Sequence, residues 1–173
     1  MSGRLIGAAL LAISSITATV ALAHSGATGI VKERMDGMKA MTEGLKSLVP
    51  MIKKDRPYDP QTVRDVATVL QAHAGQNMLE LFPEGSLQMP TEARPEIWTN
   101  WEDFSRQAMR LSVMAQGLAL SAETGLAAPG SAQVTITGAT TAQEIGALPV
   151  PVVLNAIGEN CLACHTDYRI KTD

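Results

Sequence analysis

Residues 159–169 have the sequence ENCLACHTDYR, which contains both cysteines of the 173-residue chain and one of its three histidines. The spacing is Cys161-x-x-Cys164-His165. An α-helix turns by about 100° per residue, so residues three and four apart share a face. Cys161 and Cys164 therefore lie side by side, and His165 lies one turn beyond Cys161. The stretch is predicted to present two thiols and an imidazole together.

Several kinds of site use a close pair of cysteines, and most of them fit this chain poorly. A disulfide here would close a very small loop and would stabilise little. A thioredoxin-like dithiol belongs to a βαβ fold, and a structural zinc site needs four ligands, although the chain has no second cysteine pair. An inert buried pair would leave His165 unexplained. Cys-x-x-Cys-His is the attachment sequence of c-type haem. We therefore predict one covalent haem c per chain, attached to Cys161 and Cys164, with its iron bound by His165.

The N-terminal stretch, residues 1–23, has the features of a secretory signal peptide. It contains one basic residue, Arg4, followed by an uncharged apolar run and small residues before Ala23. An uncleaved membrane anchor is the alternative, but a glycine and several hydroxyl side chains weaken a spanning helix. Cleavage after Ala23 leaves a single domain, residues 24–173, and export predicts a location in the periplasm.

The charge of the exported domain argues against several partners. Removal of Arg4 leaves 13 of the 14 basic residues against 17 acidic ones, a net charge of −4. Such a chain has no basic surface to follow nucleic acid phosphates. No second apolar run is long enough to span a membrane. We therefore expect neither nucleic acid nor, after signal cleavage, a membrane span.

Two helices are predicted in the first half of the domain. After Gly29, apolar residues recur at steps of three and four, which predicts a helix up to about Pro50. They include Val31, Met35, Met38, Leu45 and Leu48. Beyond a polar break, Asp59 is a good N-cap and Pro60 suits the first position of a helix. The second apolar stripe runs from there to Leu81.

A loop and the most regular helical pattern follow. Residues 82–95 contain three prolines and a glycine, which predicts a loop. The third helix is predicted from about Ile97 to a stop near Gly125. Its apolar positions are Ile97, Trp101, Phe104, Ala108, Leu111, Ala115, Leu118 and Ala122.

The third helix and the last one are separated by an unusual connection. Residues 131–148 are predicted to be an extended loop. Thr141 and Glu144 have the spacing of a capping box, which indicates a short helix before Pro149. The last helix is predicted over residues 151–171, with both cysteines on its apolar face.

Four amphipathic helices with little strand predict an all-α fold, an antiparallel four-helix bundle with covalently bound haem. The composition agrees with this prediction. Only 3% of the residues are aromatic, while nine are methionine. A helical core of this size would ordinarily use more aromatic side chains, and a haem would supply the missing flat apolar bulk.

With a haem motif on the last of four helices, the sequence resembles the class II cytochromes c, the cytochrome c prime family. The resemblance covers most of residues 24–173. It rests on IVKERMDGM (30–38), PYD (57–59), RPEIW (94–98) and IGENCLACHTDYR (157–169). The last two stretches are the specific ones. The chain departs from the family pattern in an insert at residues 128–151, which affects the third connection and leaves the haem site unchanged.

The resemblance implies which residues surround the haem. In this family, the residue four positions after an arginine of the first helix faces the open side of the iron, and here these residues are Arg34 and Met38. Methionine there is similar to the low-spin branch with His and Met ligands, whereas an aliphatic residue marks the five-coordinate, gas-binding branch. The resemblance also implies that Arg34 bonds a haem propionate, that Met35 lines the ring and that Glu92 approaches the haem edge. The residues alone leave Met35, Met38 and Met41 as candidates, and methionine also serves as a core filler.

These features predict a periplasmic, monohaem one-electron carrier that is not itself an enzyme, with low-spin iron bound by His165 and Met38. A His/Met ligand pair raises the reduction potential and suits electron transfer. The alternative function is a five-coordinate sensor or scavenger of NO or CO, which requires an open iron site or an easily displaced Met38. A third hypothesis is a subunit of a dehydrogenase or reductase. Redox proteins are the expected partners, and the resemblance implies a homodimer through the first two helices.

Overall fold

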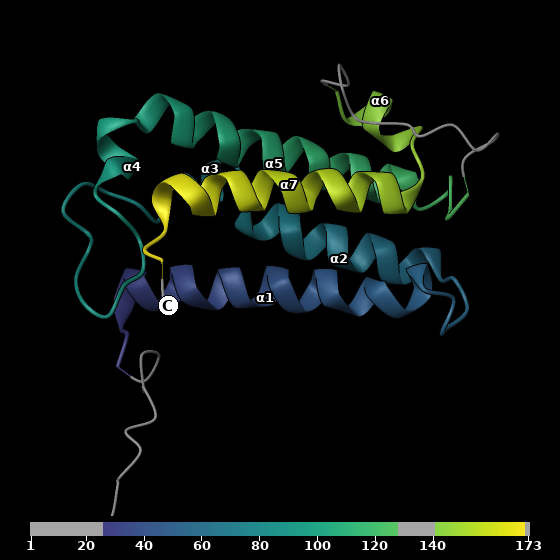
Figure 1. The fold of residues 1–173 in the computed structure, drawn as a ribbon, viewed down its shortest axis with the longest axis horizontal. Helices are drawn as coiled ribbons and strands as arrows, with labels where there is room; N and C mark the ends of the chain where they lie inside the picture. The colour runs from purple at the N-terminus through teal and green to yellow at the C-terminus, as the bar shows by residue number, and fades with distance from the viewer. Residues whose placement is uncertain (1–25, 128–140, 172–173) are drawn as a thin grey trace, which may run out of the picture.

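The described residues of this computed structural model, 26–127 and 141–171, contain four long helices and three short ones. In chain order they are α1 (Gly29–Ile52), α2 (Pro60–His73), α3 (Gln76–Leu79), α4 (Glu96–Thr99), α5 (Trp101–Ser121), α6 (Ala142–Gly146) and α7 (Val150–Tyr168). The long helices α1, α2, α5 and α7 lie side by side in alternating directions, so the predicted antiparallel four-helix bundle is confirmed (Figure 1). The predicted signal peptide and residues 128–140 of the insert lie outside the described residues.

Two of the predicted helix starts are confirmed in detail. The Asp59 carboxylate caps α2 by accepting hydrogen bonds from the backbone N–H groups of Gln61 and Thr62, at 3.0 and 3.2 Å. Thr141 and Glu144 form the predicted capping box at the start of α6. Both caps satisfy N–H groups that the first turn of a helix leaves without a partner.

The second and third predicted helices are each interrupted at a point where the apolar pattern predicted a continuous helix. The stripe predicted to reach Leu81 breaks after His73, because Gly75 adopts a left-handed φ of 59° and its N–H bonds the carbonyl oxygen of Ala108 at 3.0 Å. The predicted third helix is divided at Asn100, which has φ −120° and ψ 37° and separates α4 from α5. Both breaks are corrections to the predicted extents.

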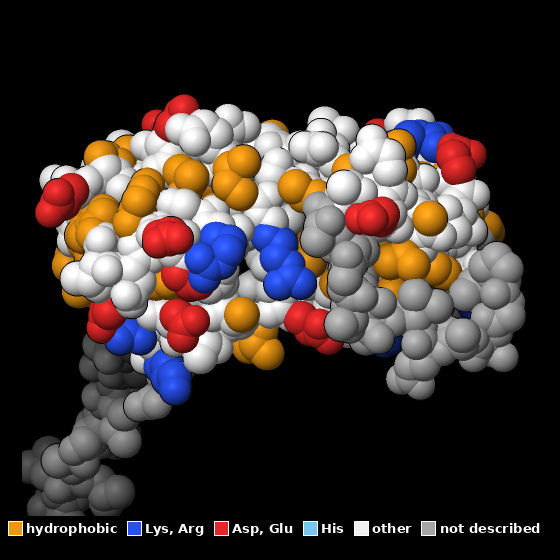
Figure 2. Space-filling model, turned by 90° about the horizontal axis from the view of Figure 1, so that it is seen from above, with side chains coloured by type: hydrophobic (Ala, Val, Ile, Leu, Met, Phe, Trp, Pro, Cys, Tyr) orange, Lys and Arg blue, Asp and Glu red, His pale blue; other side chains and the backbone are white. Residues whose placement is uncertain are grey.

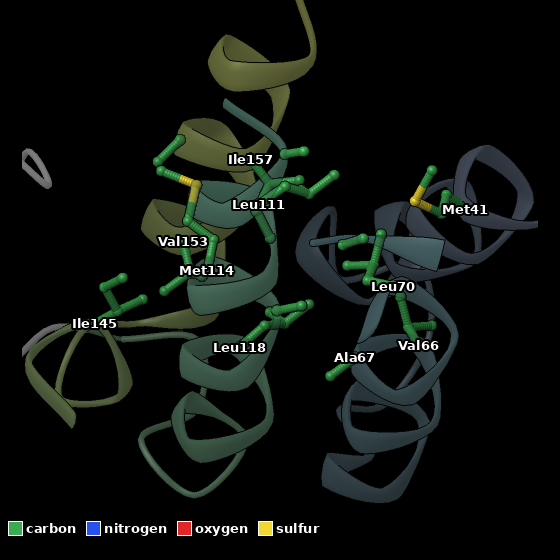
Figure 3. Packing of buried hydrophobic residues seen from close by; sticks show 14 of the residues in the cluster. Met41, Val66, Ala67, Leu70, Leu111, Met114, Leu118, Ile145, Val153 and Ile157 are labelled. Atoms are coloured by element: carbon green, nitrogen blue, oxygen red, sulfur yellow. The ribbon is translucent and has the colours of Figure 1, made fainter. Parts of the chain in front are cut away.

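The helices of the bundle form two pairs around one apolar core. α1 packs on α2, α2 on α5, and α5 on α7. Figure 3 shows Met41 and Leu70 from the α1/α2 pair on one side and Leu111, Met114 and Val153 from the α5/α7 pair on the other. α1 and α7 have little or no direct packing with each other among the described residues. The bundle is therefore closed along three of its four edges and open along the fourth.

The short helix α6 is seated on the outside of α5 by two glycines. A Cβ atom at Gly117 of α5 would lie 2.3 Å from a methyl carbon of Ile145, and one at Gly146 would lie 2.4 Å from Cβ of Leu120. No side chain fits at such distances, so α6 can approach α5 only because both positions lack a Cβ. The end of the insert is thereby fixed to the closed part of the bundle.

The surface on the α5 side carries mixed charges. Looking down onto this side, Figure 2 shows acidic, basic and apolar side chains interspersed among the described residues. The full chain has a formal net charge of only −3. Within the described ranges, no helix is long and apolar enough to cross a membrane.

Candidate haem site

The three residues of the predicted attachment motif lie in the last two turns of α7. Cys161 and Cys164 are half-buried against the apolar core, and their sulfurs are not joined in a disulfide. His165 is also half-buried, whereas Leu162, between the cysteines, is 69% exposed. The helix thus turns the two thiols and the imidazole inward together, as the spacing predicts.

Burial keeps these groups uncharged. It raises the pKa of the Cys161 thiol, and it raises the pKa of Cys164 to about 12 with added repulsion from Cys161, Asp167 and Asp103. Burial lowers the pKa of His165, and the nearby Arg169 lowers it further while Glu92 opposes the shift. His165 is therefore a neutral imidazole at pH 7, with the free electron pair that a ligand of iron needs.

Two glycines mark the side of α1 that faces α2. A Cβ at Gly37 would meet the imidazole of His73 at 2.9 Å, and one at Gly44 would meet Val66 at 3.4 Å, so both glycines face α2. Met38 follows Gly37 by one residue, about 100° further round the helix. Met38 is half-buried and belongs to the border of the core. Its side chain therefore lies on the part of the apolar face that α2 does not cover.

The open edge of the bundle matches a flat apolar ligand. Met38 on α1, like Cys161 and Cys164 on α7, is only half-buried although it packs against the core, and Met35 and His165 on the same helices are half-buried as well. Core positions on the closed edges, such as Leu118, are fully buried. Apolar side chains at an uncovered edge, opposite two thiols and an imidazole, are the surroundings that a covalently attached haem requires.

Arg34 provides an independent test of this fit. Its side chain is 6% exposed, donates two hydrogen bonds to Ser86 and lies 4.7 Å from the ring centre of Phe82. Burial lowers the pKa of Arg34, and no carboxylate within the described ranges pairs with it. A buried cation without a counter-charge is costly, and a haem propionate would supply the missing anion. The residues present therefore fit haem.

Glu92, predicted from the resemblance to approach the haem edge, is bound to Arg169 in the described chain. The Arg169 guanidinium donates to the Glu92 carboxylate from Nε at 2.7 Å and from Nη2 at 2.6 Å. Arg169 is the residue that caps the C-terminus of α7, one turn after His165. The structure thus brings Glu92 to the end of α7 that carries the motif, and its contact with haem stays a prediction.

A polar network that sequence reasoning missed joins α7 to α5 on both sides of the motif. The Tyr168 hydroxyl and the Gln107 amide each donate to Oδ2 of Asp103 at 2.7 Å. The buried Asn160, just before Cys161, donates to the carbonyl oxygen of Gln107 at 3.2 Å. The two bonds between α7 and α5 join residues more than 50 positions apart in sequence, and no local pattern links them. The network ties the motif-bearing turns of α7 to α5.

Two hollows on the surface are lined by residues outside the haem motif, although one of them borders the turn that follows His165. One lies between α4, the start of α5 and the end of α7, and its lining includes Arg94, Asp103 and Tyr168. Another lies at the far end of the bundle, next to Met51 and Tyr58. Neither contains Met38 or the two cysteines.

A Cys-x-x-Cys-His motif on the last helix of an open-edged four-helix bundle defines a class II c-type cytochrome. The chain belongs to the cytochrome c′ family, whose sequence profile matches residues 29–142. Its cofactor is therefore haem c with its iron. The match takes in α1, α2 and α5, while the attachment motif lies beyond its end.

Relatives extend the similarity over the motif. The chain is 29% identical to cytochrome c′ of Rhodospirillum rubrum over 170 residues, which cover 98% of this chain and 99% of the relative. It is 28% identical to cytochrome c-556 of Agrobacterium tumefaciens over 143 residues, which cover 83% of this chain and 98% of the relative. The similarity thus includes proteins with both names.

Solved structures of the family share the fold. The crystal structure of cytochrome c′ from Thermochromatium tepidum matches with a TM-score of 0.61 at 25% identity, over 82% of this chain and 95% of that one. Cytochrome c′ from Alcaligenes xylosoxidans, solved as a carbon monoxide-bound variant, matches with a TM-score of 0.59 at 22% identity, over 82% of this chain and 94% of that one. At 22% identity, the similarity to the Alcaligenes xylosoxidans structure shows a shared fold and nothing more.

Proposed function

We propose that this chain is a one-electron carrier whose haem iron is bound by His165 and Met38, and that it is not itself an enzyme. Met38 carries the proposal. It places a thioether on the uncovered face of α1, one turn after the buried Arg34 and at the same end of the bundle as the motif of α7. A thioether is a soft ligand, and a His/Met pair raises the reduction potential and suits electron transfer.

Each residue of the site has a defined part in this proposal. When bound, haem c is attached through thioether bonds to Cys161 and Cys164 and supplies an iron that takes up or releases one electron. His165 offers its neutral imidazole from the α7 side, and Met38 keeps other ligands from the α1 side. The three guanidinium N–H groups that Arg34 does not donate to Ser86 are available for a propionate. Met35, half-buried one turn before Met38, lines the ring.

The optical spectrum of the purified holoprotein tests Met38 directly. The wild type is expected to show low-spin iron in both oxidation states and to resist CO, because His165 and Met38 would both bind the iron. The variant Met38→Ala is expected to become high-spin and to bind CO rapidly when reduced. Met41→Ala, three residues away on the same helix, is the matched control and should keep the wild-type spectrum. If Met38→Ala stays low-spin and insensitive to CO, another residue is the ligand.

A gas-binding cytochrome is the second candidate, and the comparisons favour it over the carrier. Solved structures that match this chain include cytochromes c′, and those from Alcaligenes xylosoxidans include a nitric oxide complex and a carbon monoxide complex of variants. In such a protein Met38 would be displaced easily or would not bind the iron. Rapid CO binding by the unmodified, reduced wild type at neutral pH is the result that selects this function.

The location and the partners belong to the same proposal. The signal-like residues 1–23 support export to the periplasm, and a redox protein would then supply or accept the electron. A homodimer is the further expectation, and one cytochrome c′ with this fold is described as undergoing ligand-controlled dimer dissociation. Sedimentation of the holoprotein with and without CO tests whether this chain dimerises and whether a ligand changes that.

A further inference from the structure

The two helices that carry the proposed iron ligands pack mainly on other helices. α1 packs on α2, and α7 packs on α5, with little or no direct packing between α1 and α7 in the described chain. The separation of Met38 from the motif of α7 therefore depends on whatever else connects the two helices. Residues 82–95, which we call the strap, form the loop between α3 and α4, and they make such a connection.

One end of the strap is bound to α1. The buried Arg34 donates from Nη2 to the Ser86 carbonyl oxygen at 2.5 Å and from Nη1 to the Ser86 hydroxyl at 3.2 Å. Its guanidinium also lies over the ring of Phe82, 4.7 Å from the centre. Ser86 is itself only 7% exposed. This contact is therefore a buried, charge-assisted anchor one turn before Met38.

The other end of the strap is bound to α7. Besides the Glu92–Arg169 ion pair, Arg94 donates its backbone N–H to the carbonyl oxygen of Tyr168 at 2.9 Å, and Ile170 donates to that of Glu92 at 2.7 Å. Ala93 and Arg169 form the isolated antiparallel bridge. Figure 1 shows this loop running beside the first turns of α1 and the end of α7. The anchor lies directly after the turn that carries His165.

We propose that the strap sets the approach of α1 to α7 and so determines how firmly Met38 occupies the distal side of the haem. With both ends anchored, α1 cannot move away from α7, and Met38 blocks incoming ligands. With either anchor broken, the open edge widens and small gases gain access to the iron. Glu92 and Arg169 are positioning residues in this account. The inference deepens the proposed function and rests on it for the identity of the ligand.

A charge-swap experiment tests the α7 anchor. The holoproteins to compare are the wild type, Glu92→Arg, Arg169→Glu and the double variant, in which the ion pair is restored with reversed polarity. The readout is the rate of CO binding to the reduced protein. Each single variant is expected to bind CO about tenfold faster, within the range typical of coupling between sites. The double variant should return to within about twofold of the wild type.

A matched swap at the far end of the bundle is the control. Arg64 on α2 and Glu123, in the turn after α5, form an ion pair at 2.5 Å. The variants Arg64→Glu, Glu123→Arg and their double variant repeat the same charge changes away from the haem. These proteins should bind CO at the wild-type rate. Helical content by circular dichroism and haem content must be equal across the set.

The possible outcomes test the proposal about the strap separately from the proposed function. Single swaps that leave the CO rate unchanged overturn the strap. A double variant as fast as the singles also overturns it, because Glu92 and Arg169 would then act on the haem one by one and not as a pair. A high-spin wild type rejects Met38 as the ligand, and the ratio between single and double variants still shows whether the strap controls the distal side.

Discussion

The closed and open edges of this bundle are built from the same helical pattern, and they differ in what lies opposite. Along α5 the apolar positions meet α2, α6 and α7, and Met114, Ala115 and Leu118 are almost fully buried. On α1, which packs mainly on α2, Met35 and Met38 are only half-buried. The same residue type is thus a core filler on one edge and a candidate iron ligand on the other.

This difference shows where the chain depends on its cofactor. On the closed edges, side chains satisfy one another, and their burial stabilises the bundle. On the open edge, two thiols, an imidazole and a thioether are only half-buried, and the buried guanidinium of Arg34 has no carboxylate partner within the described ranges. The matched substitutions below separate the two edges, in order of decreasing expected effect.

The largest contrast is expected between two methionines. Met114→Ala removes a side chain that is 1% exposed and should cost about 2–5 kcal/mol of the free energy of unfolding, with the haem spectrum unchanged. Met38→Ala removes a half-buried side chain, so its packing loss should be roughly half of that or less, while the spectrum changes. Guanidinium unfolding followed by circular dichroism, with absorption spectra of the same samples, measures both. Equal stability losses would show that the two edges are packed alike.

The next largest effect on stability is expected at the contact between α6 and α5. Gly117→Ala places a methyl group 2.3 Å from Ile145 and should cost about 1–3 kcal/mol through overpacking, although alanine favours helix. Adding Ile145→Ala should recover part of that loss by making room, and this non-additivity is the sharper signal. Thermal unfolding of the two single variants and the double variant measures it. A purely additive double variant would mean that α6 is not seated through this contact.

The Tyr168–Asp103 contact predicts a pH dependence of stability. Hydrogen bonds from Tyr168 and then Gln107 lower the pKa of Asp103, so the folded state binds its proton more weakly than the unfolded state. The stabilisation is complete above the ordinary carboxyl pKa of about 4 and is lost as the pH falls through the lower folded value. Tyr168→Phe should cost about 1–2 kcal/mol at pH 7 and less in acid.

Unfolding of wild type and Tyr168→Phe at intervals between neutral pH and acid measures this dependence. The difference in stability between the two proteins should shrink on the acid side. A constant difference across the range would show that the hydroxyl of Tyr168 contributes packing or a neutral hydrogen bond and does not hold the Asp103 carboxylate.

The smallest effect is expected for an ion pair on the closed part of the surface. Arg64→Gln breaks the pair with Glu123, whose side chains are 38% and 79% exposed. Exposed pairs contribute little, so the loss should be about 0.5 kcal/mol or less and should disappear in high salt. Neither the spectrum nor the CO rate should change. A spectral change here would mean that the far end of the bundle communicates with the haem.

Local rules predicted much of the fold and the placement of the two cysteines on one face of a helix. The caps at Asp59 and Thr141, the apolar stripes and the shared face of the two cysteines depend on neighbours a few residues away, which the sequence displays directly. The breaks at Gly75 and Asn100 were not predicted. Gly75 bonds Ala108, 33 residues away, and its left-handed backbone follows from that tertiary contact.

The contacts around the motif show why the rest of the site could not be predicted. Arg34 could be placed on α1 by periodicity, but its bonds to Ser86 depend on how a proline-containing loop folds back. Glu92 and Arg169 are 77 residues apart and meet only because the strap reaches the end of α7. No spacing rule relates residues across such distances, because the pairing is decided by the packing of whole helices.

By itself, the sequence determined the number and type of the long helices, the haem attachment motif and the candidate ligands, because each of these follows from residue chemistry within one or two helical turns. Only the tertiary structure decided which edge of the bundle stays open, which arginine is left buried without a counter-charge, and how one loop binds both ligand-bearing helices. Those features arise from long-range packing, in which many weak contacts are satisfied together. A local sequence pattern cannot predict them, because the contacting residues are far apart in the chain.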